Sequence, residues 1–128
     1  MEQKNILIIE DDPRVRKSIG EMFSESCKVE YAENGTEGLF KMTYNKYDLI
    51  ITDLHMPNMN GVEMLELRSK KRPYDEKTPI IMCTTECDTQ LKKRGLGAGV
   101  GYWLIKPFNI LRLYQLVEKI ISRRETLY

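Results

Sequence analysis

Three carboxylates and one lysine stand at positions in this chain where their side chains could do chemistry together. Glu10 and Asp11 end one apolar run, Asp53 ends another, and Lys106 follows a third. Carboxylates held close together repel one another strongly, and a single lysine cannot neutralise three of them. A hard divalent cation can, and an oxygen-only, partly hydrated ligand set is typical of Mg²⁺. Beside such a cation and a lysine, an aspartate is a competent nucleophile toward phosphorus.

Each of these residues, and each neighbour of similar type, also has a plainer structural interpretation when it is considered alone. Asp12 suits a helix cap, Asp53 could begin a turn, and Thr84 could be an ordinary strand threonine. Lys106 and Pro107 could form a cis-proline turn. All of these positions fall at the carboxyl ends of separate predicted strands. That coincidence favours a common site.

The apolar runs predict the strands that would bring these residues together. Continuous apolar runs without polar alternation are typical of strands buried on both faces, as in parallel sheets covered by helices. A weaker strand, nearer an edge, is predicted over residues 29–32. The four clear runs are residues 6–9, 49–51, 80–83 and 102–105.

Helical patterns separate the predicted strands. The first follows Asp12 and Pro13, which suit an N-cap and a first helical residue. The clearest is the last, where apolar residues recur at helical spacing from Ile110 to Ile121 after the predicted cap Asn109. The other predicted helices cover residues 36–45, 61–71 and 88–98.

This alternation of strands and helices predicts an α/β fold, a five-stranded doubly wound parallel sheet with right-handed crossovers. Of the two common strand orders, five strands favour the flavodoxin-like order 2-1-3-4-5, a (βα)5 arrangement. Ligands of such sheets bind at the carboxyl ends of the strands, near the switch point between strands 1 and 3. Residues 10–11, 52–53, 84–85 and 106–107 occupy those ends.

Length and composition are those of one globular domain, predicted over residues 1–128. Apolar residues make up 41% and charged residues 30%, and the net charge of +1 gives no global attraction to nucleic acid or membrane. The polar start leads into a four-residue apolar run, which is too short for a signal peptide. Three cysteines without CxxC spacing predict reduced thiols, so we expect a cytoplasmic protein.

Four segments, in order along almost the whole chain, resemble the receiver domains of two-component response regulators, including chemotaxis receivers. Residues 6–13 (ILIIEDDP) are similar to the first strand and acidic pair of that family. Residues 53–61 (DLHMPNMNG) resemble its phosphorylation loop, which is the most specific of the four motifs. Residues 79–85 (PIIMCTT) resemble its fourth strand, and residues 104–108 (LIKPF) resemble its lysine-proline turn.

The resemblance implies a role for each matching residue. Asp53 would be the phosphoacceptor, and Glu10, Asp11 and Asp53 would hold Mg²⁺, for which Mn²⁺ could substitute. The backbone carbonyl of His55 would be a further metal ligand. Thr84 would bond a phosphoryl oxygen, and Lys106 would form an ion pair with it. The switch residues would be Thr84 and Trp103, the latter standing where the family keeps an aromatic side chain.

Some positions depart from the family pattern or invite a tuning role. Glu10 replaces the commoner aspartate, Thr85 is larger than usual, and Trp103 is bulkier than the usual tyrosine or phenylalanine. His55 and Glu86 are candidates, with Thr85, for tuning dephosphorylation. The segment around the fourth helix also carries an unusual run of glycines, at positions 95, 97, 99 and 101.

The resemblance implies a signalling domain that catalyses only its own phosphorylation and dephosphorylation, not an enzyme with an independent substrate. A histidine kinase or phosphotransfer protein would be the phosphodonor. Phosphorylation would change binding of a downstream protein through the face formed by the fourth helix, fifth strand and fifth helix. We expect no direct contact with nucleic acid or membrane, and a monomer or a weak phosphorylation-dependent dimer. The chain would be a stand-alone receiver or the receiver part of a longer response regulator or hybrid kinase.

Three alternatives stay open. An aspartate-nucleophile phosphatase would need a second aspartate two residues after the first, where His55 stands. A flavin-binding electron carrier would need a phosphate loop after the first strand, where this chain has three acids. A degenerate receiver that acts only as a scaffold would not need the complete set of Glu10, Asp11, Asp53, Thr84 and Lys106.

Overall fold

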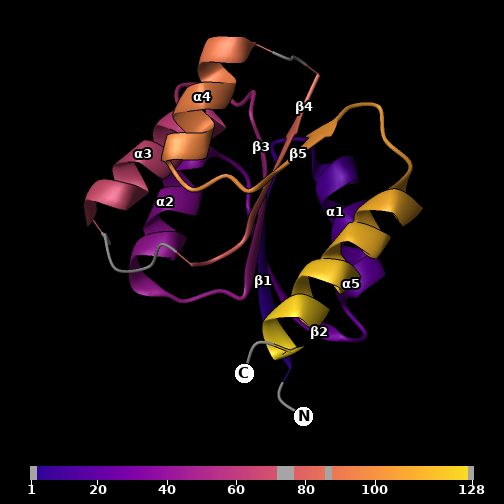
Figure 1. The fold of residues 1–128 in the computed structure, drawn as a ribbon. Helices are drawn as coiled ribbons and strands as arrows, with labels where there is room; N and C mark the ends of the chain where they lie inside the picture. The colour runs from indigo at the N-terminus through magenta and orange to yellow at the C-terminus, as the bar shows by residue number, and fades with distance from the viewer. Residues whose placement is uncertain (1–2, 72–76, 86–87, 127–128) are drawn as a thin grey trace.

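The fold was analysed in a computed structural model that describes residues 3–71, 77–85 and 88–126, with side chains described as far as residue 123. Within these ranges strands and helices alternate strictly along the chain (Figure 1). The elements are β1 (Lys4–Ile9), α1 (Pro13–Phe23), β2 (Cys27–Ala32), α2 (Gly35–Tyr44), β3 (Leu49–Asp53), α3 (Gly61–Lys71), β4 (Ile80–Thr84), α4 (Thr89–Gly97), β5 (Tyr102–Ile105) and α5 (Ile110–Thr126).

The five strands form one parallel sheet in the order β2-β1-β3-β4-β5, which confirms the predicted topology. The register aligns the carboxyl ends of the inner strands. Ile9 pairs with Thr52, Asp53 with Cys83, and Thr84 with Ile105. Residues just after Ile9, at Asp53 and just after Ile105 therefore lie along one edge of the sheet.

Side chains alternate between two apolar layers, one on each face of the sheet. Leu7 and Ile9 of β1 face the layer that contains α2, α3 and α4, whereas Ile6 and Ile8 face the layer that contains α1 and α5. Figure 1 shows α2, α3 and α4 on one side of the sheet and α1 and α5 on the other. Because both faces are covered, the inner strands are largely apolar, as their sequence predicted, whereas the edge strand β2 carries Lys28 and Glu30.

Capping residues set where the helices begin. The Asp12 side chain accepts a hydrogen bond from the backbone N–H of Arg14, and Pro13 opens α1, which confirms that prediction. Asn109 caps α5 through the N–H of Leu111. Asn60 and Glu63 each accept from the other's backbone N–H at the start of α3, and this reciprocal pair fixes the end of the loop that follows Asp53.

None of the helices in the described ranges combines the length and the apolar character that crossing a bilayer would require.

A candidate phosphoacceptor and metal site at the carboxyl edge of the sheet

An acidic pocket lies where β1, β3 and β5 end. Glu10, Asp11 and Asp53 each offer a carboxylate oxygen, and these oxygens all lie within 4.8 Å of one another. Glu10 is 4% exposed and Asp53 8% exposed, whereas Asp11 is an exposed residue. The pocket is therefore built from two buried carboxylates and one that faces solvent.

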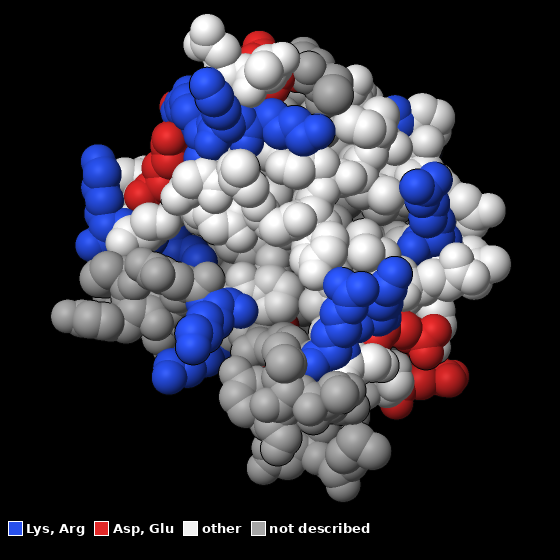
Figure 2. All heavy atoms as spheres, viewed as in Figure 1, with Lys and Arg blue, Asp and Glu red and all other residues white. Residues whose placement is uncertain are grey.

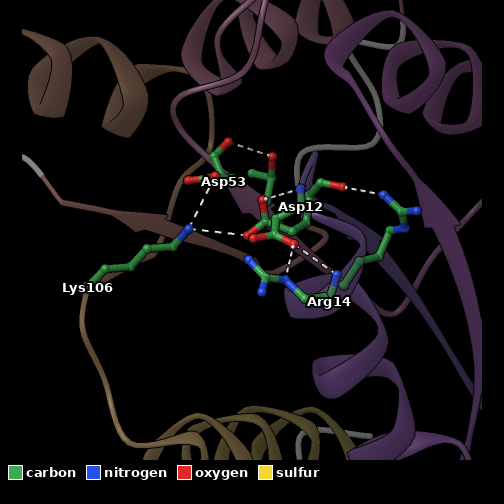
Figure 3. Close-up of polar contacts among 7 residues, drawn as sticks. Asp12, Arg14, Asp53 and Lys106 are labelled. Carbon is green, nitrogen blue, oxygen red and sulfur yellow. Dashed lines mark hydrogen bonds and ion pairs between the residues drawn. The ribbon is translucent and has the colours of Figure 1, made fainter.

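Lys106 reaches two of these carboxylates. Its Nζ lies 3.2 Å from Glu10 Oε1 and 3.2 Å from Asp53 Oδ2, and Figure 3 shows Lys106 pointing toward Asp53. The Lys106 backbone N–H donates to the carbonyl of Thr84, and the Lys106-Pro107 peptide bond is cis. One lysine charge is thus shared by Glu10 and Asp53.

Glu10 is held by the backbone around it. Its Oε2 accepts from the N–H of Asp12 at 3.3 Å, and its own carbonyl accepts from Arg16 Nη1 at 2.9 Å. Burial raises the pKa of Glu10 to about 7, and the charge of Asp53 adds to this, against the opposing effect of Lys106. In the metal-free pocket Glu10 is therefore poorly stabilised as an anion.

The other titratable groups of the pocket follow the same electrostatics. Burial lowers the pKa of Lys106, but the negative charges of Asp53 and Glu10 outweigh it, so its pKa is raised. Burial also raises the pKa of the Cys83 thiol to about 12, because a thiolate would be poorly solvated at its place in β4. Lys106 therefore stays charged and Cys83 stays a neutral thiol at neutral pH.

Close packing fixes the backbone of Asp53. The N–H of Leu54 donates to the carbonyl of Cys83 at 3.0 Å, and the N–H of Gly61 donates to the carbonyl of Leu54 at 2.8 Å. A Cβ at Gly61 would lie 2.5 Å from the Asp53 carbonyl oxygen, so only glycine fits at that contact. Sequence reasoning did not assign Gly61 a role; its position at the end of the loop and the start of a helix was the available signal.

The remaining predicted site residues lie around the pocket at different depths. Thr84 ends β4 and is fully buried, whereas Thr85, the next residue, is exposed. His55 is exposed in the loop after Asp53. Trp103 of β5 is half-buried and packs against the α4 side of the core. Glu86 lies outside the described residues.

The donor set fits a hard divalent cation. Its three candidate ligands are all carboxylates, and among the described residues they form the one cluster of acidic, histidine or cysteine side chains with metal-binding spacing. Oxygen donors with one ligand open to solvent suit a partly hydrated Mg²⁺. A cavity of about 660 Å³ opens beside the pocket and is lined by Arg14, Thr85, Lys106 and Phe108, among others.

Comparisons with known proteins agree with this fold. Residues 6–118 match the family model described as the response regulator receiver domain. The chain is 35% identical over 121 residues to the response regulator ArlR of Staphylococcus haemolyticus, covering 94% of this chain and 53% of that protein. ArlR of Staphylococcus aureus strain Mu50 is 35% identical over 120 residues, with 93% and 53% covered. The chain thus spans about half the length of these curated relatives.

Two solved structures are similar over nearly their whole length. The chemotaxis response regulator CheY4 of Vibrio cholerae is 31% identical with a TM-score of 0.82, covering 93% of this chain and 99% of that one. A CheY-like receiver domain protein from Methanospirillum hungatei is 29% identical with a TM-score of 0.88, covering 99% and 100%. This chain belongs to the response-regulator receiver family, and it is the receiver domain of a two-component signalling protein.

Proposed function

We propose that this domain accepts a phosphoryl group on Asp53 from a phosphohistidine of a histidine kinase or phosphotransfer protein, in a Mg²⁺-dependent reaction. The observation that carries the proposal is the position of the Asp53 carboxylate, 3.2 Å from Lys106 Nζ and within 4.8 Å of oxygens of Glu10 and Asp11. A carboxylate in such a setting is a suitable nucleophile for phosphorus.

In the proposed transfer, an Asp53 carboxylate oxygen forms a bond to phosphorus while the bond from phosphorus to the donor imidazole nitrogen breaks. The imidazole leaves with the electron pair of that bond. Lys106 is placed to stabilise the negative charge on the phosphoryl oxygens, and Thr84 would donate its hydroxyl to one of them. Hydrolysis by water would return Asp53 and inorganic phosphate, so the domain would catalyse only reactions of its own side chain.

Glu10, Asp11, Asp53 and the His55 carbonyl would hold the metal, which when bound supplies positive charge opposite the transferring phosphoryl group. Mn²⁺ would substitute, because it also accepts carboxylate, carbonyl and water ligands. The burial of Glu10 and Asp53 supports this proposal. Two buried carboxylates that face each other gain most from a second cation.

Exposed residues near the pocket would tune how long the phosphoryl group lasts. Thr85 lines the cavity beside Lys106, where an attacking water or a donor would approach. His55 is exposed in the loop after Asp53. We propose these two and Glu86 as tuning positions, with Thr85 the best supported by its place.

The proposed output surface is the face formed by α4, β5 and α5. Figure 2, in the same view as Figure 1, shows an uncharged area on this face with Lys and Arg side chains around it. Ile105 of β5 is 47% exposed and Leu96 of α4 is 67% exposed. Phosphorylation would change this face through Thr84 and Trp103, and a downstream protein would recognise the change.

We propose one receiver unit over residues 1–128, acting alone or within a longer response regulator or hybrid kinase, in the cytoplasm. A scaffold receiver without phosphorylation is disfavoured by the intact ion pairs of Lys106 with Glu10 and Asp53. A phosphatase is disfavoured because the position two residues after Asp53 is His55, not an acid.

Acetyl phosphate with Mg²⁺ tests the assignment. The intact mass should rise by about 80 Da, the mass of one phosphoryl group, and Asp53→Asn should abolish the rise. Asp88→Asn is a matched control, because Asp88 is an exposed helix cap and asparagine caps equally well. Labelling that survives in Asp53→Asn would reject Asp53 as the phosphoacceptor.

A further inference from the structure

The indole of Trp103 lies directly against the backbone of Gly95 in α4. A Cβ built at Gly95 would be 2.6 Å from Cζ2 and 3.1 Å from Cη2 of Trp103, and 3.5 Å from Cγ2 of Val100. A contact of 2.6 Å requires something to shift, so any other residue at position 95 would displace this part of the ring or the helix. The ring fits because position 95 has no side chain.

The helix makes a contact with a neighbouring segment on each side of this position. Arg94, the preceding residue, forms a two-point ion pair with Glu66 of α3, at 2.7 and 3.1 Å. The carbonyl of Gly95 accepts from the N–H of Val100 at 2.9 Å, in the connection toward β5. Arg94 thus connects α4 to α3 through its ion pair. Gly95 connects α4 to the segment that leads into β5 through its carbonyl.

We propose that Gly95 is a positioning residue for Trp103: its missing Cβ forms a seat on α4 for the indole, and the occupied seat couples α4 to the phosphoacceptor site. The inference rests on the proposed function and deepens it. Trp103 pairs with Met82 in the β4–β5 register, two residues before Thr84, so β4 connects the seat with the pocket. On this proposal, a phosphoryl group on Asp53 is bound most tightly while the ring is seated.

Gly97 supplies a matched control on the same helix. A Cβ at Gly97 would meet nothing within 4 Å, and neither Gly95 nor Gly97 has a positive φ. Alanine favours helix over glycine at both positions, so Gly95→Ala and Gly97→Ala share that effect. They differ in the clash with Trp103.

Trp103 emission in the metal-free protein tests the seat itself, because Trp103 is the only tryptophan of the chain. Gly95→Ala should shift the emission to longer wavelength and increase quenching by acrylamide, whereas Gly97→Ala should match wild type. If Gly95→Ala and Gly97→Ala have the same emission and the same quenching, the proposal that Gly95 makes room for the indole is rejected.

Calorimetric titration of beryllofluoride in the presence of Mg²⁺ tests the coupling. Gly95→Ala should bind the phosphoryl mimic at least about fivefold more weakly than Gly97→Ala, the lower range of ordinary coupling between sites. The double variant Gly95→Ala, Trp103→Phe should bind like Trp103→Phe alone, because the shorter ring avoids the added methyl. Equal affinities of Gly95→Ala and Gly97→Ala would overturn the coupling.

Failure of this inference can be told apart from failure of the proposed function. If wild type does not bind beryllofluoride, the proposed function fails, and the emission comparison still decides whether the seat exists. Should Gly95→Ala not fold, recovery of folding in the double variant supports the seat. A double variant that stays unfolded while Trp103→Phe alone folds would overturn it.

Discussion

Single residues carry the chemistry of this domain, and Glu10 is the one whose environment is least favourable to its charge. It is 4% exposed, faces Asp53, and shares Lys106 with it. Its pKa of about 7 in the fold stands well above the 4.5 of an ordinary glutamate. The folded protein therefore binds this proton more tightly than the unfolded chain does.

This difference predicts a pH-dependent stability in the metal-free protein. The contribution of Glu10 to the free energy of unfolding should be greatest below about pH 4.5 and fall as the pH rises through about 7, by on the order of 3 kcal/mol. Glu10→Gln should remove this fall, whereas Glu118→Gln, at an exposed position of α5, should retain it. Urea unfolding in EDTA at several pH values measures both. Parallel pH profiles for wild type and Glu10→Gln would contradict the prediction.

At the scale of elements, the start of α3 lies directly against Asp53, the proposed phosphoacceptor. Gly61 opens α3 with no room for a Cβ, because the carbonyl oxygen of Asp53 is 2.5 Å from where it would lie. The helix and the end of β3 are thus in backbone contact across the loop between them.

Gly61→Ala should therefore destabilise the protein and slow phosphorylation by acetyl phosphate. Overpacking of this kind costs about 1–3 kcal/mol, and the displaced Asp53 carbonyl would carry the carboxylate with it. Gly101→Ala is the control, because a Cβ there meets nothing within 4 Å. Urea unfolding and mass-resolved phosphorylation rates measure the two effects. A Gly61→Ala protein as stable and as reactive as Gly101→Ala would show that the contact relaxes without consequence.

The elements themselves were largely predictable, because their signals are local. The strands of residues 6–9, 49–51, 80–83 and 102–105 are continuous apolar runs, and caps such as Asp12 and Asn109 mark helix starts. Ligands of such sheets bind at the carboxyl ends of the strands, and this rule predicted that Glu10, Asp53 and Lys106 lie close together. The contacts of Gly61 and Gly95 were not predictable, because each depends on the distance between two elements after packing. The burial of Glu10 beside an exposed Asp11 is a tertiary property of the same kind.

At the scale of the whole molecule, a cation bound in the acidic pocket would raise global stability. Glu10, Asp11 and Asp53 are close together only in the fold, so Mg²⁺ that binds there favours the folded state. At 100 times its dissociation constant, Mg²⁺ should add about 2.7 kcal/mol, which corresponds to roughly 10 °C in Tm for a chain of this length.

Thermal unfolding with and without Mg²⁺ measures this shift. Asp11→Asn should reduce the shift and raise the Tm of the metal-free protein, because it removes one repelling charge. The control is Asp88→Asn, at an exposed cap on α4, which should shift with Mg²⁺ as wild type does. A wild-type Tm that does not respond to millimolar Mg²⁺ would reject the pocket as a cation site.

The buried thiol of Cys83 has a consequence for measuring motion in this domain. Cys83 lies opposite Asp53 in the register, is 3% exposed, and has a pKa raised to about 12. A thiol in this state reacts with alkylating or disulfide reagents only when β4 opens to solvent. In a chain whose Cys27 and Cys87 are replaced, the labelling rate of Cys83 would measure how often the sheet opens beside Asp53. The labelling rate of Cys83 would therefore report local opening of β4, the strand next to the one that carries Asp53.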